Sequence, residues 1–187
     1  MKLYLIRHGK TLANEKRCYC GITDLSLTVD GRKELELKKK NYQFIDKKKT
    51  LFYTSSLKRS IESLIILFGD VQYQSDERFN EMNFGEFEMH THQELLKNPH
   101  YLEWLKDVEH YQIPGGERSI DQKERVIQAF KEIKKFNKDI VLVTHGGVIS
   151  ILYNYLFPNE TKNIYEIQPN NGEGLLIDLD QLSYEKI

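Results

Sequence analysis

Cysteine is scarce in this chain: only two of the 187 residues are cysteines, Cys18 and Cys20. Small secreted domains that depend on disulfides carry many more, so a disulfide scaffold is excluded. The two thiols are one residue apart, which does not suit a Cys-x-x-Cys redox pair, and two thiols cannot close a structural zinc site alone. We expect both thiols to be reduced and chemically inert.

The chain also lacks low-complexity segments, internal repeats and long apolar runs. It holds four prolines, at positions 99, 114, 158 and 169. With no linker in the sequence, residues 1–187 are expected to form a single domain, since a typical domain has about 150 residues. No run reaches the ~18 apolar residues of a membrane span, and the apolar part of the N-terminus is too short for a signal peptide. The sequence therefore predicts a cytoplasmic protein.

Neither sign of charge is in excess, because 27 basic and 28 acidic residues leave a net charge of −1. A balanced chain has no global field that would recruit nucleic acid or a membrane surface. Two lysine runs occur, at residues 38–40 and 47–49, and such runs are most often solvated faces. We expect a small-molecule partner and neither nucleic acid nor membrane. The oligomeric state stays open between monomer and homodimer.

The chain does contain an alternation of short apolar runs and amphipathic segments. Strands are predicted over residues 3–6, 51–54, 71–73, 140–144 and 175–177. Helices are predicted over residues 28–41, 57–68, 91–107, 119–136 and 148–157. The run at 140–144 (IVLVT) is unbroken and rich in β-branched residues, as is typical of a strand buried on both faces. The pattern predicts an α/β fold with a mostly parallel central sheet flanked by helices on both faces.

Residues that can carry chemistry directly follow three of the predicted strands. Arg7 and His8 follow the first strand, His145 follows the most regular one, and a helix with Arg59 in its first turn follows a third. Ligands bind at the carboxyl ends of strands in parallel sheets, so these groups should converge on one crevice. Two guanidinium groups beside a helix N-terminus are suited to an anion. The sequence therefore predicts a phosphate-binding site.

Five blocks of sequence, in order and spread over nearly the whole chain, resemble the histidine phosphatase superfamily. They are residues 7–14 (RHGKTLAN) with 21–31 (GITDLSLTVDG), 55–60 (SSLKRS), 80–88 (NEMNFGEFE), 114–117 (PGGE) with Arg125, and 143–148 (VTHGGV). The Arg-His-Gly triplet alone would be a weak signal, but five blocks in register are specific. The resemblance implies a phosphoglycerate mutase-like fold in which residues 86–117 form a small helical cap that sets specificity.

The resemblance also implies roles for individual residues. His8 corresponds to the nucleophile, and Glu81 to the general acid that protonates the leaving oxygen and later activates water. The residues implied to hold and neutralise the phosphate are Arg7, Asn14, Arg59, His145 and Gly146. Glu86 and Glu88 are close to Glu81 in the sequence, and only the register of the family motif favours Glu81. No cofactor and no metal are implied.

Within the superfamily, the chain resembles the phosphatases more than the phosphoglycerate mutases. Mutases are usually longer, place a tyrosine where this chain has Phe84, and carry a pair of adjacent arginines that is missing here. The sequence as a whole most resembles the α-ribazole phosphatase and broad-specificity phosphatase group. We therefore expect a phosphomonoesterase that works through a phosphohistidine, with α-ribazole 5′-phosphate as one candidate substrate. The alternatives are a phosphoglycerate mutase and a non-catalytic phosphate-binding regulatory module.

Two positions depart from the family pattern: Met89 and Arg118 stand where glycine and serine are more usual. Met89 would remove a flexible hinge beside the pocket, and Arg118 would add a positive charge near the distal part of the substrate. Two other patterns are weighed and set aside. The histidines between residues 90 and 110 lack partners with the spacing of a zinc site, and too little chain follows Asp178 and Asp180 for an aspartate-phosphatase domain.

Overall fold

The computed structural model describes residues 1–160 and 162–187. Its strands are β1 (Lys2–Arg7), β2 (Leu51–Thr54), β3 (Tyr73–Ser75), β4 (Ile140–Thr144), β5 (Gly174–Asp178) and β6 (Ser183–Lys186). Its α-helices are α1 (Leu12–Lys16), α2 (Val29–Lys38), α3 (Lys58–Phe68), α4 (His92–Leu95), α5 (Pro99–Lys106), α6 (Ser119–Lys134), α7 (Gly146–Leu156) and α8 (Ile164–Ile167). Short 3-10 helices are η1 (Lys39–Tyr42), η2 (Glu77–Phe79), η3 (Gly85–Phe87) and η4 (Pro158–Glu160).

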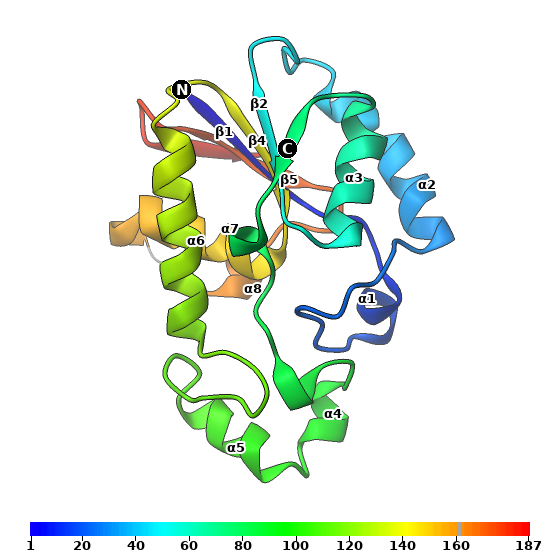
Figure 1. Ribbon diagram of the computed structural model, residues 1–187, viewed down its shortest axis with the longest axis vertical. Helices are drawn as coiled ribbons and strands as arrows, with labels where there is room; N and C mark the ends of the chain where they lie inside the picture. The colour runs from blue at the N-terminus through cyan, green and yellow to red at the C-terminus, as the bar shows by residue number, and fades with distance from the viewer. Residues whose placement is uncertain (161) are drawn as a thin grey trace.

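The strands form a six-stranded sheet in the order β3-β2-β4-β1-β5-β6. Strands β3, β2, β4 and β1 run parallel, whereas β5 is antiparallel to β1 and β6 is antiparallel to β5. The predicted α/β fold with a mostly parallel sheet is confirmed. Val143 of β4 stands opposite both Ile6 of β1 and Thr54 of β2. The carboxyl ends of these three strands therefore lie together at one edge of the sheet (Figure 1).

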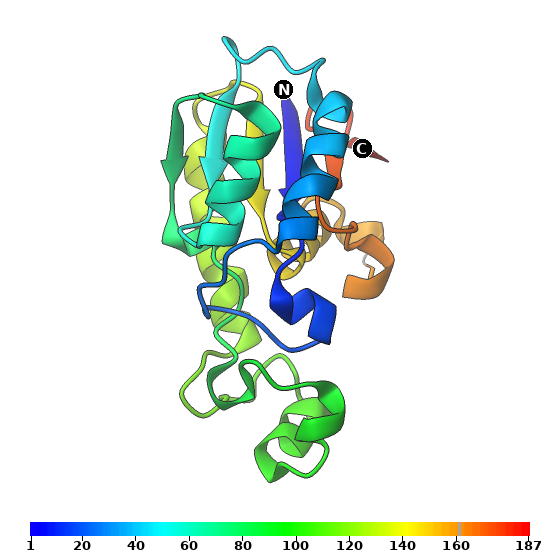
Figure 2. The ribbon, with the colours of Figure 1, turned by 90° about the vertical axis from the view of Figure 1, so that its right-hand side faces the viewer.

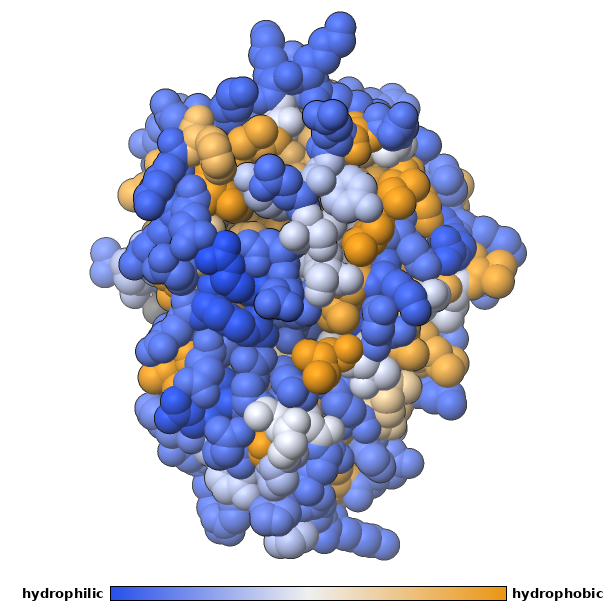
Figure 3. Space-filling view, viewed as in Figure 1, coloured by the Kyte–Doolittle hydropathy of each residue, from blue (hydrophilic) through white to orange (hydrophobic). Residues whose placement is uncertain are grey.

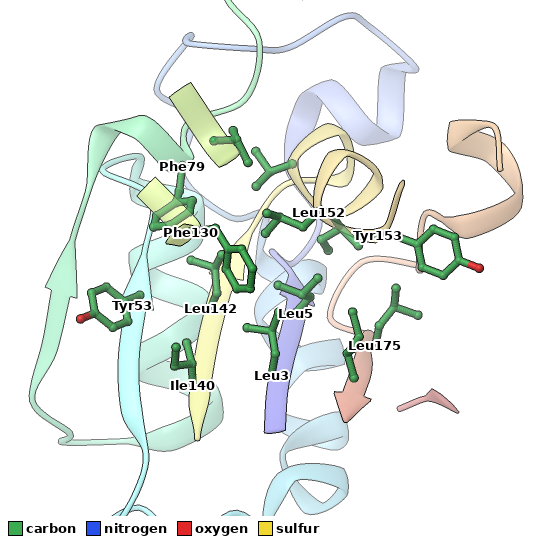
Figure 4. Close-up of a cluster of buried hydrophobic side chains, with 14 of the residues drawn as sticks. Leu3, Leu5, Tyr53, Phe79, Phe130, Ile140, Leu142, Leu152, Tyr153 and Leu175 are labelled. Carbon is green, nitrogen blue, oxygen red and sulfur yellow. The ribbon is translucent and has the colours of Figure 1, made fainter. Parts of the chain in front are cut away.

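Helices cover both faces of the sheet, as predicted. Helices α2 and α3 pack on one face, and α6 and α7 pack on the other (Figures 1 and 2). The side chains of β1 alternate between the faces: Leu3 and Leu5 join the core formed with α6 and α7, and Tyr4 and Ile6 join the core formed with α2 and α3. Figure 4 shows the first of these cores, where strand side chains meet Phe130 of α6. Burial on both faces explains why β1 and β4 read as unbroken apolar runs.

The predicted helix over residues 91–107 is wrong, because two helices, α4 and α5, occupy that segment. Helix α4 ends at Leu95, and Asn98 begins α5: its Oδ1 accepts hydrogen bonds from the backbone N–H groups of His100 (2.8 Å) and Tyr101 (3.4 Å). Pro99 takes the first position of α5, where its missing N–H costs nothing. A proline inside a helical pattern thus marks a new helix start.

Other boundaries shift by a few residues. The strand predicted over 71–73 begins at Tyr73 and ends at Ser75, and the helix predicted over 28–41 becomes α2 followed by η1. The sequence patterns do not predict α1, α8 or β6. These elements have five, four and four residues, which is too short for a periodic pattern to show.

The segment predicted to form a cap, residues 86–117, forms a separate apolar cluster together with Met82. Its buried members are Met82, Phe87, Leu95, Tyr101, Trp104 and Ile113. Helices α4 and α5 lie in the lower part of Figures 1 and 2, beyond the edge at which β1 and β4 end. The cap segment is therefore next to the edge that carries the predicted phosphate-binding residues.

Polar residues cover most of the face shown in Figure 3, and the apolar residues on it form small separate groups. The lysine runs are only partly solvated. Lys38 is 24 % exposed, donates to the carbonyl oxygen of Asn171 (2.8 Å) and pairs with Glu173 (3.0 Å), so the prediction of a solvated run is wrong there. Among the described residues, no helix has the length and apolar character needed to cross a membrane.

Candidate active site

Three strand ends bring the predicted phosphate-binding residues together. His8 and His145 follow β1 and β4, whose last residues, Arg7 and Thr144, are partners in the sheet. The ring centroids of His8 and His145 are 5.1 Å apart in an edge-to-face arrangement. Arg59 lies in the first turn of α3, after β2. His8, Arg59 and His145 are 6, 1 and 0 % exposed, so this group of polar residues is buried.

His8 is held as a neutral imidazole with a defined tautomer. Its Nδ1 lies 2.7 Å from the carbonyl oxygen of Gly9. Because a carbonyl oxygen can only accept, Nδ1 carries the hydrogen and Nε2 keeps its lone pair. Burial lowers the pKa of His8 well below its ordinary value, and the charges of Arg59 and Arg7 lower it further. An uncharged imidazole with a lone pair at Nε2 can act as a nucleophile at neutral pH.

His145 is also kept neutral, at the start of α7. Its Nε2 lies 2.8 Å from the hydroxyl oxygen of Ser55 and 3.4 Å from that of Ser60. Burial lowers the pKa of His145 well below its ordinary value, and the charge of Arg59 contributes. When the Ser55 hydroxyl donates to Nε2, Nδ1 carries the ring hydrogen and can donate it to an anion. The sequence patterns assign no role to Ser55, and its place directly after β2 is the signal that points to it.

Two arginines of the candidate site lie on different elements, Arg7 at the end of β1 and Arg59 in α3. Arg59 donates from its terminal nitrogens to the carbonyl oxygens of Gly21 (2.6 Å) and Thr23 (2.9 Å). Arg7 donates to the carbonyl oxygen of Pro169 (3.0 Å). Burial lowers the pKa of both guanidinium groups, yet both stay protonated at neutral pH because an arginine pKa starts above 12.

Buried nitrogens without a hydrogen-bond partner gather at this point. Within residues 1–160 and 162–187, Arg7 Nε, Arg59 Nε and His145 Nδ1 are buried and have none. Such groups are rare in native proteins, because an unmade hydrogen bond to a buried group costs about 1–3 kcal/mol. These three belong to Arg7, which precedes His8, to His145, whose ring contacts that of His8, and to Arg59, whose charge lowers the pKa of His8; they form a set of donors for a bound anion.

Asn14 and Gly146, the other two residues predicted to hold phosphate, lie in α1 and at the start of α7. Asn14 Oδ1 accepts hydrogen bonds from the backbone N–H (2.9 Å) and the hydroxyl (3.0 Å) of Thr11, which leaves the Nδ2 group as the donor of this amide. Gly146 is the first residue of α7, where a Cβ would lie 1.6 Å from Nε2 of Gln168. A side chain at position 146 would therefore displace its neighbour.

The Glu81 carboxylate lies against the first turn of α7. It accepts hydrogen bonds from the backbone N–H groups of Gly147 (3.0 Å) and Met82 (3.0 Å) and from Gln122 Nε2 (2.9 Å). Gly147 is two residues after His145, so this contact places the carboxylate beside the candidate phosphate site, and its charge raises the pKa of Arg7 in opposition to burial. A carboxyl group at this position can exchange protons with a molecule bound at the arginines.

The two rival carboxylates have different surroundings. Glu86 is exposed and accepts a hydrogen bond from Asn98 Nδ2 (3.1 Å) in the cap. Glu88 accepts from the backbone N–H groups of residues 21–23, from the Thr23 hydroxyl and from the N–H of Phe84. A carboxylate with all its acceptor sites engaged is poorly placed for proton transfer. The geometry therefore favours Glu81, which the sequence selects by family register alone.

Two residues of α6 hold the Glu81 segment in place. Arg125 donates to the backbone carbonyl oxygens of residues 78, 80 and 81 and forms an ion pair with Glu117 (2.7 Å). Gln122 precedes Arg125 by three residues, so both side chains lie on the same face of the helix. The sequence patterns do not single out Gln122, and this spacing to Arg125 is the signal that could have found it.

A cavity of about 580 Å³ lies beside Glu81 and is bordered by cap residues and by residues of α6 and α7. Most of its wall is apolar or aromatic. The residues that give it this character are Tyr19, Phe84, Trp104, Leu105, Val108 and Ile151. Because Glu81 belongs to the same wall, a group bound in the cavity would be next to the candidate proton donor.

The structure also places the remaining candidates of the sequence analysis. Arg118 forms a two-point ion pair with Asp121 (2.5 and 2.8 Å), so its charge is neutralised and the expectation of an added charge for the substrate is not supported. Met89 has a φ of +62°, so its backbone lies in the left-handed region that glycine favours. Cys18 and Cys20 are free thiols. In the parts of the chain that the structure describes, no three His, Cys, Asp or Glu side chains form a metal-binding group.

Comparison with known proteins agrees with this geometry. The family model of the histidine phosphatase superfamily (branch 1) matches residues 3–183. The adenosylcobalamin/alpha-ribazole phosphatase of Escherichia coli is 29 % identical over 188 residues, with 97 % of this chain and 91 % of that protein covered. A 2,3-bisphosphoglycerate-dependent phosphoglycerate mutase of Wigglesworthia glossinidia brevipalpis is 24 % identical, with 96 % and 93 % covered.

Among solved structures, the alpha-ribazole phosphatase of Shigella flexneri superposes with a TM-score of 0.87 at 27 % identity. The superposition covers 98 % of this chain and 93 % of that one. The resemblance read from the five sequence blocks is thereby confirmed, and with it a phosphatase-type activity in the general sense. The chain belongs to the histidine phosphatase superfamily, branch 1.

Proposed function

We propose that this protein hydrolyses a small-molecule phosphomonoester through a phosphohistidine on His8, without a metal or a cofactor. The observation that supports this most is the neutral His8 imidazole, whose neighbours Arg7, Arg59 and His145 each have a buried nitrogen without a hydrogen-bond partner among the described residues. Membership of the superfamily and the similarity to phosphatases along nearly the whole chain support the same class of reaction.

The reaction has two steps. In the first, His8 Nε2 attacks phosphorus, a P–N bond forms, the P–O ester bond breaks, and protonated Glu81 gives its proton to the leaving oxygen. In the second, Glu81 takes a proton from water, the water oxygen attacks phosphorus, and the P–N bond breaks with its electron pair returning to His8. Arg7, Arg59 and His145 stabilise the charge on the phosphoryl oxygens in both steps.

Hydrolysis is favoured over a mutase reaction because the cations near the cavity are already paired. A mutase must grip a substrate that carries a second acidic group while the phosphoryl group moves. At this cavity Lys123 pairs with Glu109 (3.5 Å), and nearby Arg125 pairs with Glu117 (2.7 Å). The wall also has Phe84 where mutases place a tyrosine. These features support release of the phosphoenzyme to water.

The leaving group is proposed to be bulky, uncharged and rich in rings. A cavity of about 580 Å³ is of the size that holds small organic ligands, and its wall is mostly apolar. Trp104 lines it, and the Nε1 of that residue is a buried donor with no partner among the described residues. α-Ribazole 5′-phosphate has this character, and relatives named as alpha-ribazole phosphatases make it the first candidate substrate.

The test of the activity is hydrolysis of an aryl phosphate in excess chelator by the wild-type protein, by His8→Ala and by Glu86→Gln. We expect turnover by the wild type and by Glu86→Gln, which changes an exposed carboxylate of the same segment, and none by His8→Ala. Quenching a reaction with ³²P-labelled substrate in alkaline denaturant should trap a phosphoprotein that loses its label in acid, and only where His8 is present. Phosphate binding without turnover would instead favour a binding module, and an active His8→Ala would refute the mechanism.

The test of the substrate class compares kcat/KM for α-ribazole 5′-phosphate, phenyl phosphate and 3-phosphoglycerate. We expect the order in which they are named here, because the first fills the cavity and the last brings an unpaired carboxylate to it. Preference for 3-phosphoglycerate, or its conversion to 2-phosphoglycerate when a bisphosphate primer is present, would favour the mutase alternative.

A further inference from the structure

Glu88 lies outside the catalytic set proposed above, yet its carboxylate accepts more hydrogen bonds than the proposed acid does. Oε1 accepts from the backbone N–H groups of Gly21 (2.9 Å), Ile22 (3.1 Å) and Phe84 (3.1 Å). Oε2 accepts from the hydroxyl (2.6 Å) and the N–H (3.3 Å) of Thr23. The Glu88 carboxylate therefore binds the backbone N–H groups of all three residues of the Gly21–Thr23 loop.

The backbone carbonyl oxygens of the same loop bind a second side chain, of opposite charge. The carbonyl oxygens of Gly21 and Thr23 receive hydrogen bonds from the two terminal nitrogens of Arg59 (2.6 and 2.9 Å). The peptide group between Gly21 and Ile22 has both contacts: its C=O accepts from Arg59 and its N–H donates to Glu88, so the two opposite charges polarise it in the same sense. The loop therefore couples the charges of Glu88 and Arg59, although these two side chains form no hydrogen bond with each other.

Steric fit keeps this loop close to the cap segment. A Cβ at Gly21 would lie 1.6 Å from the carbonyl oxygen of Met82, so only glycine allows the approach. The next residue along, Asp24, accepts a hydrogen bond from the backbone N–H of Lys58 (2.7 Å) and thereby ties the loop to the start of α3. The loop is fixed to the helix of Arg59 at one end and to Glu88 along its length.

We infer that Glu88 is a positioning residue: it fixes the Gly21–Thr23 loop so that the loop's carbonyls hold the Arg59 guanidinium in the orientation that binds phosphate. This inference rests on the proposed function, in which Arg59 binds the phosphoryl oxygens. One N–H of each terminal nitrogen is engaged by the loop, so the directions of the three remaining N–H donors, that of Nε among them, follow from where the loop lies. The backbone N–H of Phe84, a residue of the cavity wall, also donates to the Glu88 carboxylate. Glu88 therefore contacts both the loop that binds Arg59 and the wall of the cavity.

The test measures binding of inorganic phosphate by calorimetry to four proteins: the wild type, Glu88→Gln, Arg59→Lys and the double variant. Glutamine offers one acceptor oxygen where the loop needs two, and lysine keeps the charge of Arg59 but lacks the planar guanidinium that holds two carbonyl oxygens in a fixed geometry. We expect Glu88→Gln to raise the dissociation constant about tenfold in the wild-type background, since hydrogen bonds to a charged group are among the stronger ones. In the Arg59→Lys background the same change should have an effect of about twofold or less, because the contact it supports is already lost.

Two further variants keep the test decisive. Glu86→Gln removes a neighbouring exposed carboxylate and should leave phosphate affinity unchanged. Thr23→Val removes only the 2.6 Å hydroxyl contact to Glu88 at constant volume, and it should weaken phosphate binding severalfold even if Glu88→Gln does not fold. A role in general stability would lower the melting temperature without changing phosphate affinity.

The outcomes separate this inference from the proposed function. If the wild type binds phosphate and the losses of Glu88→Gln and Arg59→Lys multiply in the double variant, the two residues act independently and the inference is overturned alone. If the wild type does not bind phosphate, both the proposed function and the inference fail. Coupled losses with a normal Glu86→Gln control support the positioning role.

Discussion

The two buried histidines should make the folded protein sensitive to mild acid. His8 and His145 are 6 and 0 % exposed, and burial, aided by the nearby arginines, lowers the pKa of both well below the ordinary value. In the unfolded chain each histidine titrates near its ordinary pKa of about 6.5. Below that pH the two histidines bind protons in the unfolded state and stay neutral in the folded state, so the free energy of unfolding falls as pH falls.

The magnitude follows from the linkage relation. Between about pH 7.5 and about pH 5.5, a histidine that stays neutral in the folded state loses about 1.4 kcal/mol of stabilisation, and two lose about 2.7 kcal/mol. Carboxylates whose pKa is lowered by the fold, such as Asp76 and Glu173, do not contribute in this window. Their unfolded pKa is near 4, and their stabilisation is lost only as pH falls below about 4.5.

Urea unfolding followed by circular dichroism at the two pH values measures this difference. With a slope of ~2 kcal/mol/M, the midpoint at the lower pH should be about 1.4 M below that at the higher pH. His8→Gln and His145→Gln should each remove about half of the pH-dependent difference, whatever they do to stability at a single pH. Equal midpoints for the wild type, within ~0.3 M, would refute the conclusion that both histidines are neutral in the folded protein.

Three further expectations concern the proton donor, the cap and the cavity. Gln122→Leu removes the 2.9 Å contact to Glu81 and should lower kcat about tenfold while phosphate affinity stays unchanged, as steady-state kinetics and calorimetry would show. Gly85→Ala places a Cβ 2.2 Å from the carbonyl oxygen of Pro114 at a φ of +49°, and should lower stability by about 2 kcal/mol or more in the same urea assay. Ile151→Trp fills part of the cavity and should raise KM for ring-bearing esters, with inorganic phosphate affinity as the unaffected control.

Much of the fold can be predicted from local sequence patterns. The strands β1 and β4 are unbroken apolar runs because both of their faces are buried, and that property is visible without a structure. The residues that follow them, His8 and His145, could be placed at one edge because parallel strands align their carboxyl ends. The split of the helix predicted over 91–107 was also within reach, since Asn98-Pro99 is a helix start signal.

Other elements carry too little local signal. The strand β6 has four residues, all at least partly exposed, and it is stabilised by its antiparallel pairing with β5 and not by a propensity of its own. Likewise, Ser55 and Gln122 are ordinary polar residues in the sequence, and become distinctive only through contacts with His145 and Glu81 from distant strands and helices.

The sequence by itself determined the α/β architecture and the edge of the sheet at which two histidines and two arginines meet. The tertiary structure decided how similar residues differ. Glu81 and Glu88 are both carboxylates of one short segment, and their spacing assigns neither role. Contact with α7 brings Glu81 to the candidate phosphate site, whereas a loop sixty-odd positions earlier in the chain engages all the acceptors of Glu88. Proton transfer and hydrogen bonding depend on distances between residues far apart in sequence, and only folding fixes those distances.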